Sequence, residues 1–166
     1  FFLGENFGDR APDANTIAHD LNAQPVSDLP TFSIKKVGDA DIRVLSFNVQ
    51  RDGILESGRF GAYQRMIQAI QPDILAFQEV YDISEAGMRS LMDDIMPTAP
   101  TGETWEISKV QPDIIMVSKF KLKGKETLMG GNAGGAGNGV FLYEMPDFGT
   151  DLVFINCHLP CCSNNE

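Results

Sequence analysis

Two apolar runs of strand length, joined by a segment with helical periodicity, constrain the fold of this chain more than any other feature. Ile42–Val49 and Ile74–Glu79 each have the pattern of a buried strand. Between them, apolar residues recur at helical spacing until Pro72 ends the pattern: Phe60, Tyr63, Met66, Ile67 and Ile70. Because a strand–helix–strand unit places its two strands parallel in one sheet, the sequence predicts an α/β fold.

The rest of the chain continues with a second helix and further strands. The helix is expected to begin near Asp82 or Ser84, with Asp82 and Glu85 as a capping box, and to end at Pro97. Strands are expected at Ile114–Val117, Val140–Tyr143 and Leu152–Cys157.

Two segments lack the periodicity of either element. Residues 1–40 contain several prolines and little apolar pattern, which is typical of a lead-in or linker before a domain that begins at Asp41. Residues 130–139 are rich in glycine and predict a mobile loop. A phosphate-binding turn is the weaker interpretation there, because the segment does not follow a strand and open a helix.

Polar side chains stand at the ends of the two predicted parallel strands. Asn48 closes the first, where an amide on its own is more often a structural hydrogen-bonding residue than a ligand, and Glu79 closes the second. An unpaired carboxylate is costly to bury, so Glu79 is expected at an exposed strand end or beside a cation. Since the carboxyl ends of neighbouring parallel strands meet at one edge, the two residues form a candidate site for a hard cation such as Mg²⁺.

A third polar feature lies at the end of the Leu152–Cys157 strand. Asn156 and His158 are two residues apart and therefore point to the same face of the sheet. A lone histidine is more often a core residue, but one beside a metal-bound phosphate can donate to a phosphate oxygen or relay a proton.

These segments together resemble one superfamily. LSFNV (45–49), QPDILAFQEV (71–80) and INCHLP (155–160) are similar to the three N-terminal motifs of the endonuclease/exonuclease/phosphatase, or DNase I-like, superfamily. A looser match is QPDIIMVSK (111–119), where Pro112 and Asp113 replace a region in which glycine is usual.

The resemblance implies a two-sheet α/β sandwich and a metal-dependent phosphodiesterase, phosphatase or nuclease. It assigns Asn48 and Glu79 to the metal, which would be Mg²⁺ or alternatively Mn²⁺, and His158 with Asn156 to catalysis. It covers residues 41–166 as the N-terminal half of the family domain. The later Asp-x-Asn and Asp-His pairs of the family are not found, so the general base would lie beyond Glu166 and this segment alone is expected to be inactive.

Charge bears on the partners that the protein can bind. The net charge of −10 disfavours nonspecific binding to nucleic acid. Lysines alternate at 119, 121, 123 and 125, which predicts either a lysine-protected edge strand or a local anchor for a substrate phosphate. The substrate is expected to be a phosphoester in a small molecule, a lipid head group or a nucleic acid, and no stable membrane insertion is expected.

Two other functional classes are open at this point. Cys157, His158, Cys161 and Cys162 could bind zinc or serve redox chemistry, although their adjacent spacing suits a tetrahedral ion poorly. A noncatalytic binding module with the same fold is the other alternative. The acidic composition and the coil-like start are compatible with a secreted or periplasmic hydrolase, and the sequence does not indicate an oligomeric state.

Overall fold

The computed structural model describes residue 38 and residues 41–98, 104–128 and 137–159. Apart from residue 38, the predicted lead-in (1–40) therefore lies outside the described residues, as do residues 130–136 of the glycine-rich segment and Cys161 with Cys162. Asn138 and Gly139, at the end of the predicted loop, are in a strand instead. Within the described ranges, no helix is long and apolar enough to cross a membrane.

The strand–helix–strand unit forms as predicted. β1 (Val44–Asn48) pairs in parallel with β2 (Ile74–Gln78), and α2 (Ser57–Ile70) connects them after the short 3-10 helix η2 (Gly53–Leu55). α2 ends where Gln71 adopts a left-handed conformation and its N–H bonds to Ile67 O, directly before Pro72. α3 (Glu85–Ile95) begins one residue after Ser84, whose hydroxyl accepts the N–H of Gly87. The N-cap is thus Ser84, and the Asp82 capping box was wrong.

Two sheets make up the rest of the described chain. Sheet A has the order β1-β2-β4-β3, with β3 (Glu106–Val110) and β4 (Ile114–Ser118) antiparallel to their neighbours. Sheet B has the order β5-β6-β7 and is wholly antiparallel. Its strands are β5 (Leu122–Thr127), β6 (Asn138–Tyr143) and β7 (Leu152–Cys157), with η3 (Pro146–Phe148) in the last turn.

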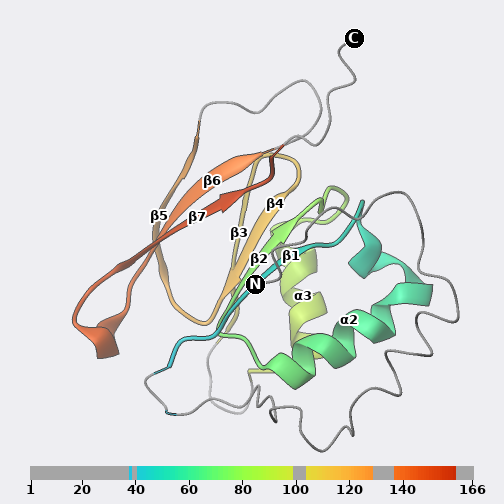
Figure 1. The fold of residues 1–166 in the computed structure, drawn as a ribbon, viewed down its shortest axis with the longest axis horizontal. Helices are drawn as coiled ribbons and strands as arrows, with labels where there is room; N and C mark the ends of the chain where they lie inside the picture. Colours follow the sequence, from blue (N-terminus) through green and yellow to red (C-terminus); the bar gives the residue numbers. More distant parts are fainter. Residues whose placement is uncertain (1–37, 39–40, 99–103, 129–136, 160–166) are drawn as a thin grey trace, which may run out of the picture. The chain divides into compact units, whose positions relative to one another are not determined.

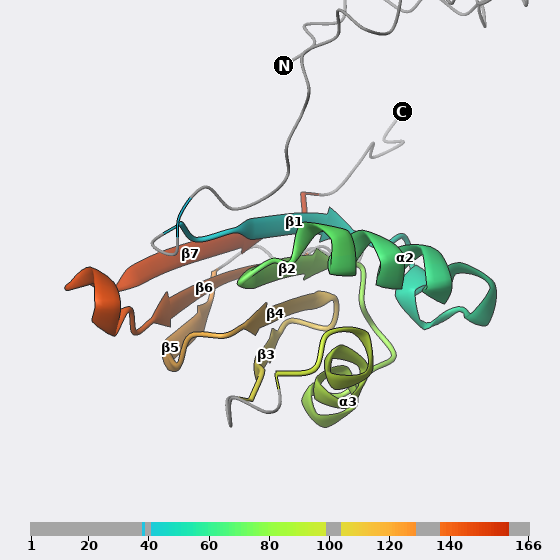
Figure 2. The same ribbon diagram turned by 90° about the horizontal axis from the view of Figure 1, so that it is seen from below.

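Sheet A lies between the helices and sheet B, as Figures 1 and 2 show. On one face, Leu75 and Phe77 of β2 pack into a core shared with α2 and α3. On the other, Ile74 and Ala76 pack into a second core shared with Phe141 and other residues of sheet B. All five residues of β2 are buried, so this strand belongs to both cores.

One edge strand of each sheet carries large exposed apolar side chains. β1 is the last strand of sheet A and β7 the last strand of sheet B. Large apolar side chains on or beside these strands are exposed, namely Val44 at 44%, Val153 at 59%, Ile155 at 56% and Leu159 at 73%. Edge strands with exposed apolar residues are usually covered by further chain.

Burial predicts a large difference between two isoleucines. Ile67→Ala, at a fully buried position of α2, should lower the free energy of unfolding by about 2–5 kcal/mol, because it removes buried methyl groups and leaves a cavity. Ile155→Ala is the matched control at an exposed position of β7 and should cost about 1 kcal/mol or less. Urea denaturation followed by circular dichroism measures both, and equal losses would contradict the assigned core.

Candidate active site

Asn48 and Glu79 meet at the carboxyl ends of β1 and β2 in sheet A, as their positions in the sequence predicted. Asn48 ends β1 opposite Gln78 of β2, and Glu79 follows. The Asn48 Nδ2 donates to Glu79 Oε1 at 2.9 Å, and the Asn48 Oδ1 accepts the N–H of Gln50 at 2.8 Å. Because the Gln50 N–H requires an acceptor, the amide oxygen of Asn48 faces Gln50 and its NH₂ group faces the carboxylate.

The turn after β1 closes around the Glu79 carboxylate. Gln50, Arg51 and Asp52 are consecutive residues in the left-handed region, with φ of 53°, 50° and 60°. This conformation costs about 1–2 kcal/mol for each residue other than glycine. It is held by the N–H of Arg51, which donates to Glu79 Oε2 at 2.9 Å, and by the N–H of Asp52, which donates to Glu79 O at 2.8 Å.

Asp52 also fixes the segment that follows Glu79. Its Oδ1 accepts the N–H groups of Tyr81 at 2.6 Å and Asp82 at 3.1 Å. Glu79 itself has a φ of 61°, so both loops leave their strands in a left-handed conformation at the site. Strained backbone conformations of this kind are common at functional sites, where the surrounding contacts hold them in place.

His158 approaches the same carboxylate from sheet B. It follows β7, and its N–H bonds to Gly137 O at 2.8 Å. Its Nδ1 lies 2.6 Å from Asp113 Oδ2 and its Nε2 lies 3.3 Å from Glu79 Oε1. An imidazolium can donate to both carboxylates, whereas a neutral ring can donate to one of them.

Asp113 is the site residue that the sequence interpretation missed. It lies in the turn that connects β3 to β4 and is fully buried, and its Oδ1 has no hydrogen-bond partner among the described residues. A Cβ at Gly137 would lie 2.6 Å from that oxygen, so only glycine fits there. The available signal was the mismatch itself: an acidic residue stands before a buried strand, where the family pattern has a glycine region.

Asn156 lies beneath the site and is 2% exposed. Its Oδ1 accepts from Gln78 Nε2 at 2.6 Å, and its Nδ2 donates to Phe77 O at 3.2 Å. Both ends of the amide are therefore used in joining β7 to β2. Asn156 and His158 lie on the same face of sheet B, as predicted. The Asn156 side chain links the two sheets.

The hydrogen bonds around Glu79 stabilise its ionised form. They hold the pKa of Glu79 below its ordinary value of 4.5, with the Asn48 amide as the largest cause, against an opposing effect of burial. The N–H of Arg51 and the charges of His158 and Arg51 act in the same direction as Asn48. The pKa of Tyr81 is raised, first by burial and then by the nearby carboxylates of Asp113 and Glu79.

The Glu79 carboxylate is the type of ligand that a hard cation uses. Glu79 is 21% exposed, and each carboxylate oxygen can accept a further partner beside its present hydrogen bond. Mg²⁺ commonly uses one or two carboxylates and takes its other ligands from water and phosphate. Across the described ranges, no three His, Cys, Asp or Glu residues gather as a metal site, and Asn48 turns its NH₂ group, not its oxygen, toward Glu79.

The alternating lysines are all engaged by carboxylates. Lys119 bonds to Asp73 at 3.1 Å, Lys121 lies 3.8 Å from Glu144, Lys123 bonds to Asp151 at 2.6 Å and Lys125 bonds to Glu85 at 2.9 Å. β5 is an edge strand of sheet B, which agrees with the prediction of a lysine-protected edge strand. The phosphate-anchor interpretation has no support in this arrangement, because each ammonium group already has an acidic partner.

The cysteine cluster can be followed at one position only. Cys157 is an exposed free thiol, and Cys161 and Cys162 lie outside the described residues. His158 points both ring nitrogens at carboxylates, so in this conformation it is not available to a zinc ion shared with Cys157.

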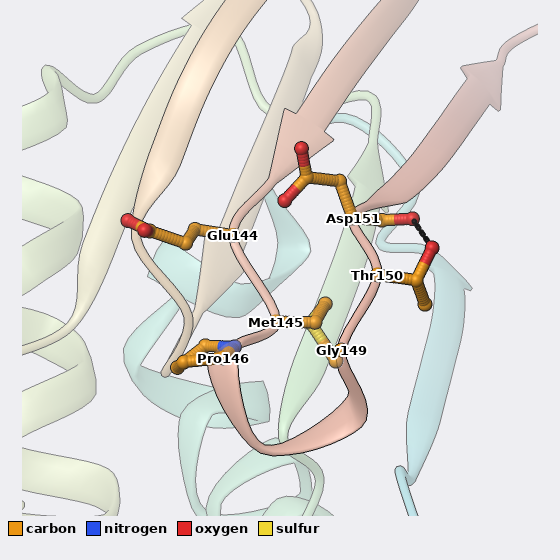
Figure 3. Close-up of a pocket in the computed structure, with 6 residues that line it drawn as sticks. All are labelled: Glu144, Met145, Pro146, Gly149, Thr150 and Asp151. Atoms are coloured by element: carbon orange, nitrogen blue, oxygen red, sulfur yellow. Dashed lines mark hydrogen bonds between the residues drawn. The ribbon is translucent and has the colours of Figure 1, made fainter.

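A separate hollow of about 260 Å³ lies at the β6–β7 turn, lined by residues 144–146 and 149–151. Figure 3 shows the lining residues around this turn. The strand register places the turn at the opposite end of the β6–β7 hairpin from His158. Its two carboxylates, Glu144 and Asp151, pair with lysines, so the hollow is not part of the Glu79 site.

Solved structures with a similar fold were found by comparison. TDP2 from Caenorhabditis elegans matches with a TM-score of 0.52 and 18% identity over 73% of this chain and 36% of its own. D. rerio TDP2 complexed with a single-strand DNA product matches with a TM-score of 0.52 and 15% identity over 76% and 49%. ANGEL2, a 2',3'-cyclic phosphatase, matches with a TM-score of 0.51 and 19% identity over 72% and 41%. The chain has a DNase I-like fold.

The match confirms the predicted fold. The chain spans less than half the length of each of these structures. No family model matches the sequence, and the comparison with curated proteins found no match.

The Asn48 hydrogen bond predicts a measurable change in the acidity of Glu79. Asn48→Ala should raise the pKa of Glu79 toward 4.5, because it removes the largest cause of the lowered value. Since the folded-state pKa lies below the unfolded one, the stabilising contribution of ionised Glu79 is present above about pH 4.5 and is lost as pH falls through the folded-state pKa.

NMR titration of the side-chain carboxyl carbons measures this shift. The Glu85 carboxyl serves as an internal control, because it bonds to Lys109 and Lys125 and makes no contact with Asn48. A Glu79 titration curve that is identical in the two proteins would contradict the assigned role of Asn48.

Proposed function

We propose that this protein is a phosphoester hydrolase in which water attacks phosphorus in line with the leaving oxygen. The observation that carries the proposal is the convergence of Glu79, His158 and Asp113, from both sheets, at one edge of a DNase I-like fold. Ligands of open α/β sheets bind at this kind of strand end. TDP2 and ANGEL2 are phosphoesterases with the same fold, which supports the reaction class.

We assign Glu79 as the metal ligand of this half of the site and Mg²⁺ as the ion, with Mn²⁺ as the alternative. When bound, the ion would polarise the phosphoryl oxygen and stabilise charge on the leaving oxygen. Asn48 was predicted as a second ligand. Its NH₂ group orients the Glu79 carboxylate in the present arrangement, and we assign it that positioning role.

His158 is the residue that we expect to touch the substrate. Its Nε2 lies 3.3 Å from Glu79 Oε1, and by exchanging this contact for one with the substrate it can donate to a phosphate oxygen as negative charge builds in the transition state. Asp113 holds the other ring nitrogen and fixes the direction of the ring. Asn156 is assigned to positioning, because its amide joins β7 to β2 directly below His158.

We propose further that residues 41–166 are the N-terminal half of the catalytic domain. Two features support this: the open edges at β1 and β7 with their exposed apolar side chains, and the match to less than half of each similar structure. The water-activating base would then belong to the other half. The 166-residue segment by itself would be inactive.

The substrate class follows less directly from the site. The similar structures include one with a single-strand DNA product and one named as a 2',3'-cyclic phosphatase, so phosphoesters of nucleic acids are candidates. The net charge of −10 favours smaller phosphoesters, including lipid head groups. Activity of the full-length protein on bis(p-nitrophenyl) phosphate, plasmid DNA, a sphingomyelin analogue and inositol phosphates distinguishes these substrates.

The reaction itself is tested at Glu79. In the full-length protein with Mg²⁺, Glu79→Gln should lower kcat/KM by at least about 10²-fold, because it removes the anionic ligand with little change in shape. Glu126→Gln, on the exposed face of β5, removes the same charge and should leave activity unchanged. Full activity in Glu79→Gln would refute the metal-ligand assignment, and no activity in either full-length protein on any substrate would favour a noncatalytic binding module.

Asp113 predicts a second effect on the same reaction. Asp113→Asn should lower kcat by about 10²-fold, because the ring of His158 loses the partner that fixes its direction and protonation. The pH profile of kcat should change with it, which a loss of stability alone would not produce. Asp147→Asn, on the exposed turn helix η3, is the control, and an unchanged profile in Asp113→Asn would remove Asp113 from the site.

A further inference from the structure

Arg51 is an exposed cation at the edge of the proposed site. Its backbone N–H donates to Glu79 Oε2 at 2.9 Å, so its Cα is fixed close to the carboxylate by the left-handed turn. This backbone bond does not depend on the nature of the side chain. The turn therefore places whatever side chain stands at position 51 beside Glu79.

The guanidinium of Arg51 is uncommitted. In the part of the chain that the structure describes, the guanidinium makes no hydrogen bond or ion pair, and Arg51 is exposed. The four lysines of residues 119–125 are in contrast all paired with carboxylates. Arg59, on α2 behind the same turn, bonds to Gln50 and Tyr63 and lies 3.6 Å from Glu56.

The charge of Arg51 reaches the site even without a direct contact. It is a minor cause of the lowered pKa of Glu79, after the Asn48 hydrogen bond, and it opposes the rise in the pKa of Tyr81 that burial causes. Both groups therefore lie within its electrostatic range. The guanidinium is free to point at an anion bound between them.

A phosphate entering this site meets unfavourable charge. Glu79 and Asp113 are both acidic and the whole chain carries −10, so the long-range field repels an anionic substrate. A guanidinium offers a planar pair of N–H donors that matches two phosphate oxygens. A cation that no carboxylate neutralises is well suited to this task.

We propose that Arg51 is a substrate-contacting residue whose guanidinium binds a nonbridging oxygen of the phosphate held at the Glu79–His158–Asp113 site. This inference rests on the proposed function, because it uses the same site. It adds a binding group that the sequence motifs do not include. Its contribution is made in the ground state as well as the transition state and therefore appears mainly in KM.

Two variants of the full-length protein test the inference. Arg51→Asn removes the charge and keeps both the backbone N–H and a residue that tolerates the left-handed conformation. It should raise KM for bis(p-nitrophenyl) phosphate and the inhibition constant of inorganic phosphate by about 10- to 100-fold, with a smaller change in kcat. Arg51→Lys keeps the positive charge but lacks the paired N–H donors of a guanidinium. Its KM and its phosphate inhibition constant should lie between those of wild type and Arg51→Asn. Arg65→Ala removes an exposed arginine from α2 and is the charge-matched control, expected to behave as wild type.

The outcomes separate this inference from the proposed function. If Glu79→Gln abolishes activity while Arg51→Asn leaves KM and the phosphate inhibition constant unchanged, or lowers kcat alone, Arg51 does not bind the phosphate and only this inference fails. If Glu79→Gln keeps full activity, the proposed function fails first. Thermal unfolding of Arg51→Asn within a few degrees of wild type excludes an indirect effect through folding.

Discussion

The complete burial of β2 is the constraint on which the rest of the structure depends. Its side chains alternate between two cores, so Leu75 and Phe77 need the helices and Ile74 and Ala76 need sheet B. A strand buried on both faces cannot shift its register without exposing one set of side chains. The residue that follows it, Glu79, is therefore carried to a fixed place at the edge of the sheet.

A buried amide of sheet B is hydrogen-bonded to β2 beside the site. Gln78, the last residue of β2, donates to Asn156 of β7, and Asn156 donates back to Phe77 O. A buried amide is costly unless both of its ends are bonded, so this pair is stable only when the two sheets pack in this arrangement. Two residues later, just after the end of β7, His158 contacts Asp113 and Glu79.

The fold was predicted from the sequence where side-chain periodicity was strong. The β1–α2–β2 unit and β7 are found within a few residues of their predicted bounds, because apolar spacing reports directly on which face is buried. β3 (Glu106–Val110) was not predicted. Its Glu106, Ser108 and Lys109 break the apolar run, and it is a strand because it pairs with β4 along its whole length.

The candidate site could be predicted only in part for the same kind of reason. Asn48, Glu79 and His158 stand in motifs that local sequence reveals. The role of Asp113 depends on a contact with a residue 45 positions away, and no local pattern reports such a contact. The orientation of the Asn48 amide depends on the Gln50 N–H, which is available only because the chain turns into the left-handed region there.

The sequence separation of the site's contacts has a consequence for how the protein matures. Asn48 and Glu79 are 31 residues apart, His158 and Asp113 are 45 apart, and Gln78 and Asn156 are 78 apart. Contacts that close long loops form late in folding, because the chain entropy that they remove must be compensated by structure already in place. During synthesis, the Asn48–Glu79 pair can form as soon as β2 has docked, whereas His158 arrives only after the whole β5–β7 meander has been made. A chain that stalls before this step would carry the Glu79 carboxylate without the histidine that contacts it, so the cluster of Glu79, Asp113 and His158 is complete only after β7 has folded.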